Sequence, residues 1–99
     1  MTLAEEFQSA CERAVEECQR LEYPPNEWIR MMHEPGGAVA AAQRLLTTGH
    51  MQSGFRRLIR MGRPDLTVEH AVLDPKWAEL FSDAHREPAR WRLTHLSNI

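Results

Sequence analysis

Residues 36–73 read GGAVAAAQRLLTTGHMQSGFRRLIRMGRPDLTVEHAVL. All five glycines of the chain lie in this stretch, and glycine favours helix ends over helix interiors. Four alanines at positions 38–42 predict a helix thin enough for another element to approach closely. Further on, Phe55, Leu58 and Ile59 recur at helical spacing and predict a second helix with one apolar face. Short helices separated by glycines indicate an all-α fold.

The N-terminal segment predicts the longest helix of the chain. Thr2 and Glu5 fit a capping box, which opens a helix that we expect to reach about Glu22. The sequence Tyr23-Pro24-Pro25 ends this helix, because proline lacks an amide donor and disfavours helical geometry in the residue before it.

Proline, glycine and capping side chains divide the rest of the chain into short helices. We expect these helices at residues 27–33, 38–48, 54–61, 68–73 and 76–81. Their candidate N-caps are Asn26, Ser53, Thr67 and Asp74, and Gly49 and Gly62 close the helices that precede them. No stretch alternates between apolar and polar residues, so we expect no strand. The prediction is a compact single-domain bundle of five to seven mostly short helices over residues 1–99. It has a long N-terminal helix at 1–22, short helices at 26–96 and a helix-turn-helix-like centre.

The C-terminal segment offers two alternatives. Ser82 can cap a helix that begins at once, but Pro88 would then lie inside that helix at a cost of about 3 kcal/mol. We therefore expect a short turn at 82–87 and a helix from Pro88 to about Leu96, with Trp91 buried.

Composition and charge narrow the class of protein. The 99 residues suffice for one domain with a modest core, and no apolar run is long enough to cross a bilayer. Two glutamates within the first six residues argue against a signal peptide, so we expect a cytoplasmic protein. Residues 1–27 carry seven carboxylates against two arginines, whereas residues 28–99 carry ten basic side chains against seven carboxylates. This asymmetry favours internal docking or a protein partner.

The second helix of the central stretch carries the best candidate for a binding surface. A helix, a turn and a second helix with a basic outer face resemble the layout of helix-turn-helix DNA readers. The candidate contacts with nucleic acid or a protein partner are Gln52, Ser53, Arg56, Arg57, Arg60 and Arg63.

Three features argue against nucleic acid. The turn at 47–52 is long, the net charge is −2, and no aromatic side chain stands among the arginines for base stacking. The alternative is a solvated arginine face that pairs partly with the acidic N-terminal helix.

The N-terminal helix carries the candidate surface for self-association. Its apolar residues follow a heptad-like spacing: Phe7, Cys11, Ala14, Cys18 and Leu21. Core packing is the alternative, since the stripe spans barely two heptads. The two cysteines lie about 10 Å apart along the helix, too far for a disulfide within the chain. They are either small buried side chains or a disulfide across a dimer interface, which a reducing cytoplasm disfavours.

The chain shows no pattern typical of catalysis or metal binding. Its five histidines have neither HxxxH nor HExxH spacing, and no Cys-x-x-Cys is present. The glycines lack the lysine and threonine of a phosphate-binding loop, and no G-x-S-x-G nucleophile motif occurs. Asp65 and Glu69 lie within one turn, but capping and first-turn electrostatics explain them more simply than acid–base chemistry. We expect neither an enzyme nor a metal or cofactor.

Several short elements follow one another in a fixed order along the chain: Gly36-Gly37, Ala41-Ala42, Leu45-Leu46, Ser53-Gly54-Phe55, Leu58, Gly62-Arg63, Asp65-Leu66-Thr67-Val68-Glu69, Val72-Leu73, Leu80-Phe81, Ala89-Arg90 and Arg92-Leu93. Together with Tyr23-Pro24-Pro25, they resemble a family of short, uncharacterised, all-helical bacterial proteins. Pro64 and Pro88 depart from that pattern. The resemblance implies a helical fold and a bacterial origin, but no assigned activity.

The sequence predicts a small non-enzymatic helical module that binds a protein partner or self-associates as a homodimer. The alternative is a helix-turn-helix-like regulatory protein that binds nucleic acid through the arginine face of residues 53–63. No membrane association and no small-molecule substrate is indicated.

Overall fold

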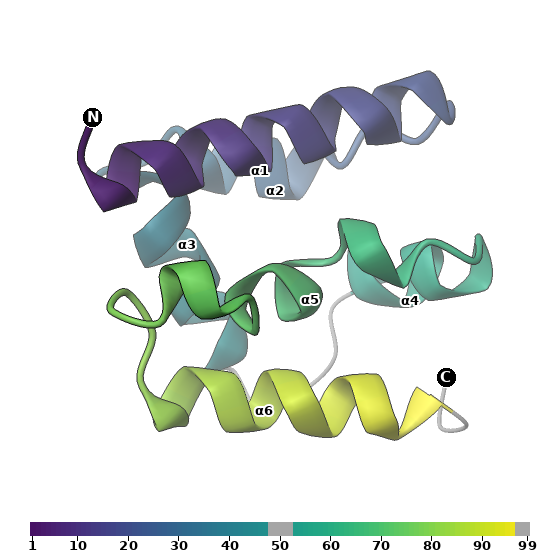
Figure 1. The fold of residues 1–99 in the computed structure, drawn as a ribbon. Helices are drawn as coiled ribbons and strands as arrows, with labels where there is room; N and C mark the ends of the chain where they lie inside the picture. The colour runs from purple at the N-terminus through teal and green to yellow at the C-terminus, as the bar shows by residue number, and fades with distance from the viewer. Residues whose placement is uncertain (48–52, 97–99) are drawn as a thin grey trace.

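The computed structural model describes residues 1–47 and 53–96 (Figure 1). These residues form six α-helices and two short 3-10 helices, joined by turns. The α-helices are α1 (Leu3–Arg20), α2 (Asn26–Met32), α3 (Gly37–Leu46), α4 (Ser53–Arg60), α5 (Val68–Val72) and α6 (Asp83–Thr94). The 3-10 helices are η1 (Pro64–Leu66) and η2 (Pro75–Trp77). No strand occurs within these ranges. The predicted all-α bundle with a long first helix is confirmed.

The helices lie at three levels that α3 connects. In Figure 1, α1 and α2 lie at the top, α4 and α5 in the middle and α6 at the bottom. α3 contacts α1, α2, α5 and α6, whereas α4 makes its main contacts with η1. The two helices of the predicted centre are therefore present as α3 and α4. Neither of them packs mainly against the other.

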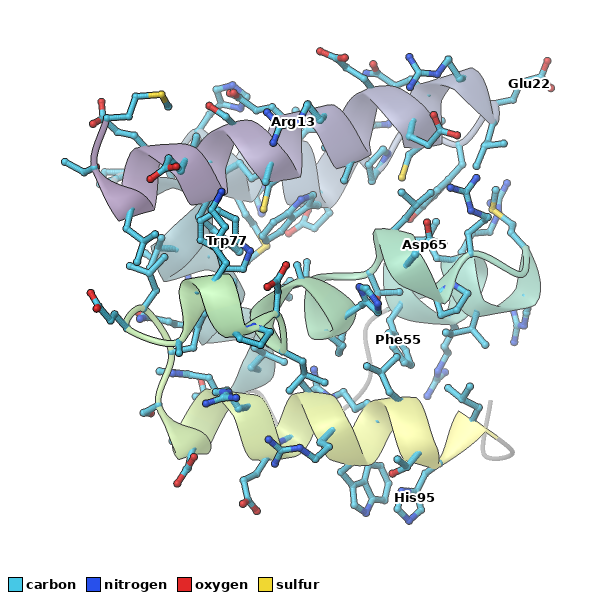
Figure 2. All side chains as sticks on the ribbon, viewed as in Figure 1. Arg13, Glu22, Phe55, Asp65, Trp77 and His95 are labelled. Atoms are coloured by element: carbon cyan, nitrogen blue, oxygen red, sulfur yellow. The ribbon has the colours of Figure 1, made fainter. Side chains whose placement is uncertain are left out.

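The core gathers around three aromatic rings. Phe7 of α1 meets Trp77 edge-on, with ring centroids 5.3 Å apart, and meets Phe81 in the same way at 5.1 Å. Trp77 points into the space between α1 and the lower levels (Figure 2). Ala41 and Ala42 of α3 are fully buried, so α3 is the thin, closely approached helix that its alanines predict.

Capping interactions confirm most of the predicted helix ends. Thr2 and Glu5 form the predicted capping box, in which Glu5 accepts from the Thr2 amide at 2.8 Å. Thr67 caps α5 and Asp74 caps η2 through their side-chain oxygens. Gly62 follows α4 with φ +76°, a conformation that few residues other than glycine adopt readily.

Other predicted boundaries need correction by one or a few residues. Asn26, predicted as the cap of the second helix, is instead its first residue and makes no capping hydrogen bond. The helix predicted at 76–81 is shorter, since only the 3-10 helix η2 forms there. Gly49, the predicted end of the third helix, lies outside the described residues.

The buried stripe of α1 differs from the heptad-like one. Phe7, Cys11 and Cys18 are buried as part of the monomer's own interior, and Val15 rather than Ala14 completes the set. Leu21, which lies beyond the end of α1, is 37% exposed. Because α3, η1 and η2 cover this face, it is not a free surface for self-association.

α6 replaces the predicted turn at 82–87 and the helix from Pro88. The helix begins directly after Ser82, whose amide donates to Nδ1 of His85 at 3.2 Å, and Pro88 lies inside it. Trp91, expected in the core, is 51% exposed. Ala89 and Arg92 are the buried residues of this helix, and at about 100° per residue Trp91 lies roughly 200° around the axis from Ala89. Burial of Ala89 therefore turns Trp91 outward.

Candidate functional site

The outer face of α4 gathers three exposed arginines. Arg56, Arg57 and Arg60 are exposed, while Phe55 and Leu58 on the other side of the helix are buried. This division confirms the predicted apolar face. Within residues 1–47 and 53–96, none of the three guanidinium groups forms an ion pair with a carboxylate. We call Arg56, Arg57 and Arg60 the arginine face.

Tyr23 fixes one edge of the arginine face. The guanidinium carbon of Arg57 lies 4.9 Å from the centre of the Tyr23 ring, within the range of a cation–π contact. The tyrosine hydroxyl approaches the α4 backbone so closely that a Cβ atom added to Gly54 would lie 2.9 Å from it. Gly54 therefore lets the segment that follows α1 pack against α4.

Arg63 does not belong to the arginine face. Its Nη2 lies 3.0 Å from Oδ2 of Asp65, and its Nη1 lies 3.3 Å from Oε1 of Glu17 on α1. The two carboxylates raise the pKa of Arg63, and its guanidinium holds the pKa of Asp65 below its ordinary value. Arg20 and then Arg63 lower the pKa of Glu17. Arg63 therefore links η1 to α1 and has no free charge to offer a partner.

The remaining predicted contact residues lie at the start of α4. Ser53 is exposed and is the first residue of the helix. Gln52 lies outside the described residues. Of the six predicted contacts, the structure brings Arg56, Arg57 and Arg60 together on one open face.

Neither cysteine is placed for reaction or for pairing between chains. Both thiols are free and buried, and burial raises the pKa of Cys11 to about 12. Burial also raises the pKa of Cys18. The thiolate is the reactive form, so both side chains are protonated and unreactive at neutral pH.

A buried ion pair joins α5 to α6, and the sequence did not reveal it. Nη1 of Arg92 lies 3.0 Å from Oε2 of Glu69, and both side chains are only 4% exposed. The same nitrogen donates to the carbonyl oxygen of Leu45 at 3.3 Å. Burial is the main influence on Glu69 and raises its pKa, although Arg92 acts in the opposite direction. This carboxylate is thus a structural element of the interior rather than a partner of Asp65.

A second exposed feature lies on α6. The rings of Trp91 and His95 stack with centroids 4.2 Å apart and planes 13° apart. Figure 2 shows His95 on the side of α6 that faces away from the other helices. Trp91 and the nearby Leu96 are among the few large apolar side chains that are exposed.

In the described part of the chain, no group of three or more metal-ligating side chains converges. No helix there combines the length and apolar character that spanning a bilayer requires. The chain matches no protein-family model, no curated protein and no solved structure. The resemblance to short bacterial proteins stays a prediction.

Proposed function

We propose that the chain is a small non-enzymatic helical module that binds an acidic segment of a protein partner through the arginine face. The observation that carries this proposal is the exposure of Arg56, Arg57 and Arg60 without carboxylate partners among the described residues. Guanidinium groups present planar donor pairs that match carboxylates, so an acidic segment is the complementary partner.

The contrast with most other basic side chains supports this choice, although Arg13 of α1 is also exposed and forms no ion pair among the described residues. Arg20, Arg30 and Arg90 pair with carboxylates on their own helices or just beyond, and Lys76 pairs with Glu6 of α1. The arginine face instead places like charges at positions i and i+4 of a helix of eight residues, an arrangement that destabilises a helix by about 0.2–0.5 kcal/mol. A partner that supplies carboxylates would relieve this repulsion.

Nucleic acid is the second candidate for the same face, because phosphates also accept guanidinium donors. The net charge of −2 and the weak packing between α3 and α4 favour an acidic protein over DNA. A second copy of the chain is a further possible occupant, since α1 exposes Glu12 and Glu16.

Fluorescence anisotropy of two dye-labelled probes tests the proposal: a glutamate-rich peptide and a short DNA duplex, both at low salt. The parent is compared with the triple variant R56A/R57A/R60A. The matched control is R13A/R20A/R90A, which removes three exposed arginines from α1 and α6. We expect the peptide to bind the parent and the control, and to bind the triple variant at least about tenfold more weakly. Tenfold corresponds to about 1.4 kcal/mol.

Other outcomes separate the alternatives. Tighter binding of the duplex than of the peptide, lost in R56A/R57A/R60A, favours the nucleic-acid candidate. A concentration-dependent mass by light scattering that the triple variant abolishes favours a second copy. Equal binding by the parent and the triple variant refutes a role for the arginine face.

A further inference from the structure

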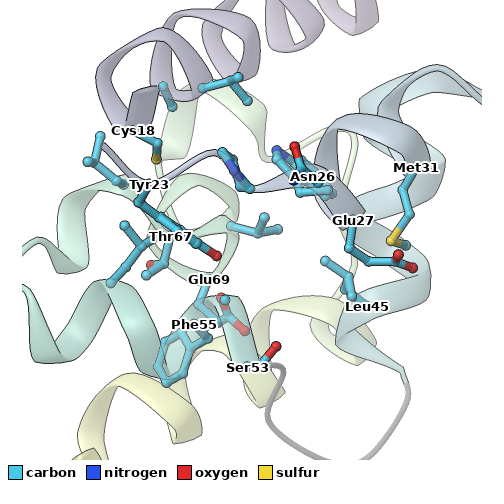
Figure 3. A pocket seen from close by; sticks show the side chains of 18 residues that line it. Cys18, Tyr23, Asn26, Glu27, Met31, Leu45, Ser53, Phe55, Thr67 and Glu69 are labelled. Atoms are coloured by element: carbon cyan, nitrogen blue, oxygen red, sulfur yellow. The ribbon is translucent and has the colours of Figure 1, made fainter. Parts of the chain in front are cut away.

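A cavity of about 280 Å³ lies between α1, α2, α4 and the η1–α5 segment (Figure 3). Its lining is mostly apolar and includes three aromatic side chains: Tyr23, Trp28 and Phe55. Small-molecule sites are typically apolar cavities of at least about 300 Å³ with a few placed polar groups. At about 280 Å³ this cavity lies just below that range, so its size and lining suit only a small organic molecule.

Glu69 supplies a buried carboxylate to the lining, since the residue is only 3% exposed. Its Oε2 accepts from Arg92 at 3.0 Å, and no other side chain of residues 1–47 or 53–96 donates to it. In Figure 3 the hydroxyl of Tyr23 points towards the middle of the cavity, on the same side as Glu69. The lining therefore offers a carboxylate and a hydroxyl oxygen to one ligand group.

The charged side chains of the lining favour a ligand with a positive charge. Glu27 and Glu69 are its ionisable carboxylates, and among residues 1–47 and 53–96 no lysine, arginine or histidine lines the cavity. An anion would give up its hydration there without gaining a cation, which is unfavourable in an apolar enclosure. An ammonium group can donate to carboxylate and hydroxyl oxygens, and aromatic rings also attract cations. Arg57 already uses the Tyr23 ring in this way from outside.

We propose that this cavity binds a small hydrophobic amine in its ammonium form. The ammonium group donates to the carboxylate of Glu69 and the hydroxyl of Tyr23, and the apolar body of the ligand lies among the aromatic side chains. This site adjoins the arginine face, since Tyr23 contacts Arg57 and also lines the cavity. The two lie on different sides of α4, because the buried Phe55 and Leu58 face the cavity while the arginines are exposed.

Isothermal titration calorimetry with three probes of matched shape tests the proposal on the intact chain. The probes are phenylpropylamine, phenylpropanol and phenylpropionate, which are cationic, neutral and anionic at neutral pH. We expect saturable binding of the amine, at least about tenfold tighter than that of the alcohol, and no measurable binding of the anion. Absence of saturable amine binding overturns the proposal, as does an alcohol or anion that binds as tightly as the amine.

Two variants locate the site. Ala14 is half-buried and lines the cavity, so A14L fills part of it and should abolish amine binding. The matched control is A4L, which adds the same side chain at an exposed position of α1. E69Q should remove the preference for the amine over the alcohol. Circular dichroism checks that each variant folds, and if E69Q does not fold, A14L decides alone: unchanged binding by A14L refutes the assignment.

Discussion

Replacing Arg92 with methionine removes the cation from a buried ion pair. Both partners are 4% exposed, and Nη1 of Arg92 also donates to the carbonyl oxygen of Leu45. Loss of one partner of such a pair leaves a buried charge without compensation and costs about 3–5 kcal/mol. Domains of this size lose roughly 4–8 °C of Tm for each kcal/mol. R92M should therefore lower Tm by at least about 12 °C.

Denaturant unfolding followed by circular dichroism measures this cost. The control is R90M, which removes the neighbouring arginine from an exposed pair with side chains 53% and 71% exposed. Such pairs contribute about 0–1 kcal/mol. The double variant E69L/R92M should recover most of the stability lost in R92M, because no unpaired charge remains.

The cost of R92M should also depend on pH. Burial raises the pKa of Glu69 above its ordinary value near 4.5. Between that ordinary value and the raised pKa, the folded protein holds this proton more tightly than the unfolded chain does. The stability of the fold therefore falls as pH rises through this interval. Without Arg92 the pKa rises further, and acidification should shrink the difference between R92M and the parent. An R92M cost below about 1 kcal/mol at neutral pH, equal to that of R90M, would refute the role assigned to the buried pair.

Three further predictions concern stability. P88A should stabilise the protein by about 1–3 kcal/mol in denaturant unfolding, because it restores an amide donor inside α6; destabilisation would contradict the helix boundaries. W77A should cost about 3–5 kcal/mol and W91A less than about 1 kcal/mol, since the first ring is buried and the second is 51% exposed; equal costs would contradict the register of α6. Arg63 helps to lower the pKa values of its two carboxylate partners, so their stabilisation is present above their ordinary pKa values and is lost as pH falls through the lowered ones. Acid titrations should show that R63A loses less stability than the parent below about pH 4.5, and identical profiles would contradict the pairing.

Local signals in the sequence predicted much of the fold. The capping box at Thr2 and the caps at Thr67 and Asp74 depend on residues two or three positions away, and all three form. The apolar face of α4 follows from its periodicity in the same way. These interactions are complete within one turn of the chain, so sequence spacing is enough to identify them.

The predictions that proved wrong concern places where residues far apart in the sequence determine the structure. Glu69 and Arg92 are 23 positions apart, and neither neighbourhood in the sequence indicates that the other is buried beside it. Burial of Arg92 and Ala89 then fixes the register of α6, which outweighs the local cost of Pro88 and turns Trp91 outward. Tertiary packing overrode propensity at this helix.

The candidate site, too, was predictable from the sequence only where neighbouring residues determine it. Helical spacing brings Arg56, Arg57 and Arg60 to one face, and they share it in the structure. The pairing of Arg63 with Glu17 spans 46 positions and removes this arginine from the face. Within residues 1–47 and 53–96, five separate segments line the cavity, so no single stretch of sequence predicts it.

We propose that a partner binds at the arginine face of α4. Backbone amide chemical shifts, recorded by NMR while the unlabelled glutamate-rich peptide is added, test this claim directly. We expect the largest shift changes in α4 and at Tyr23, whose ring lies under Arg57. Changes centred instead on Trp91 of α6 and His95 just beyond its end, with α4 unaffected, would contradict this proposal.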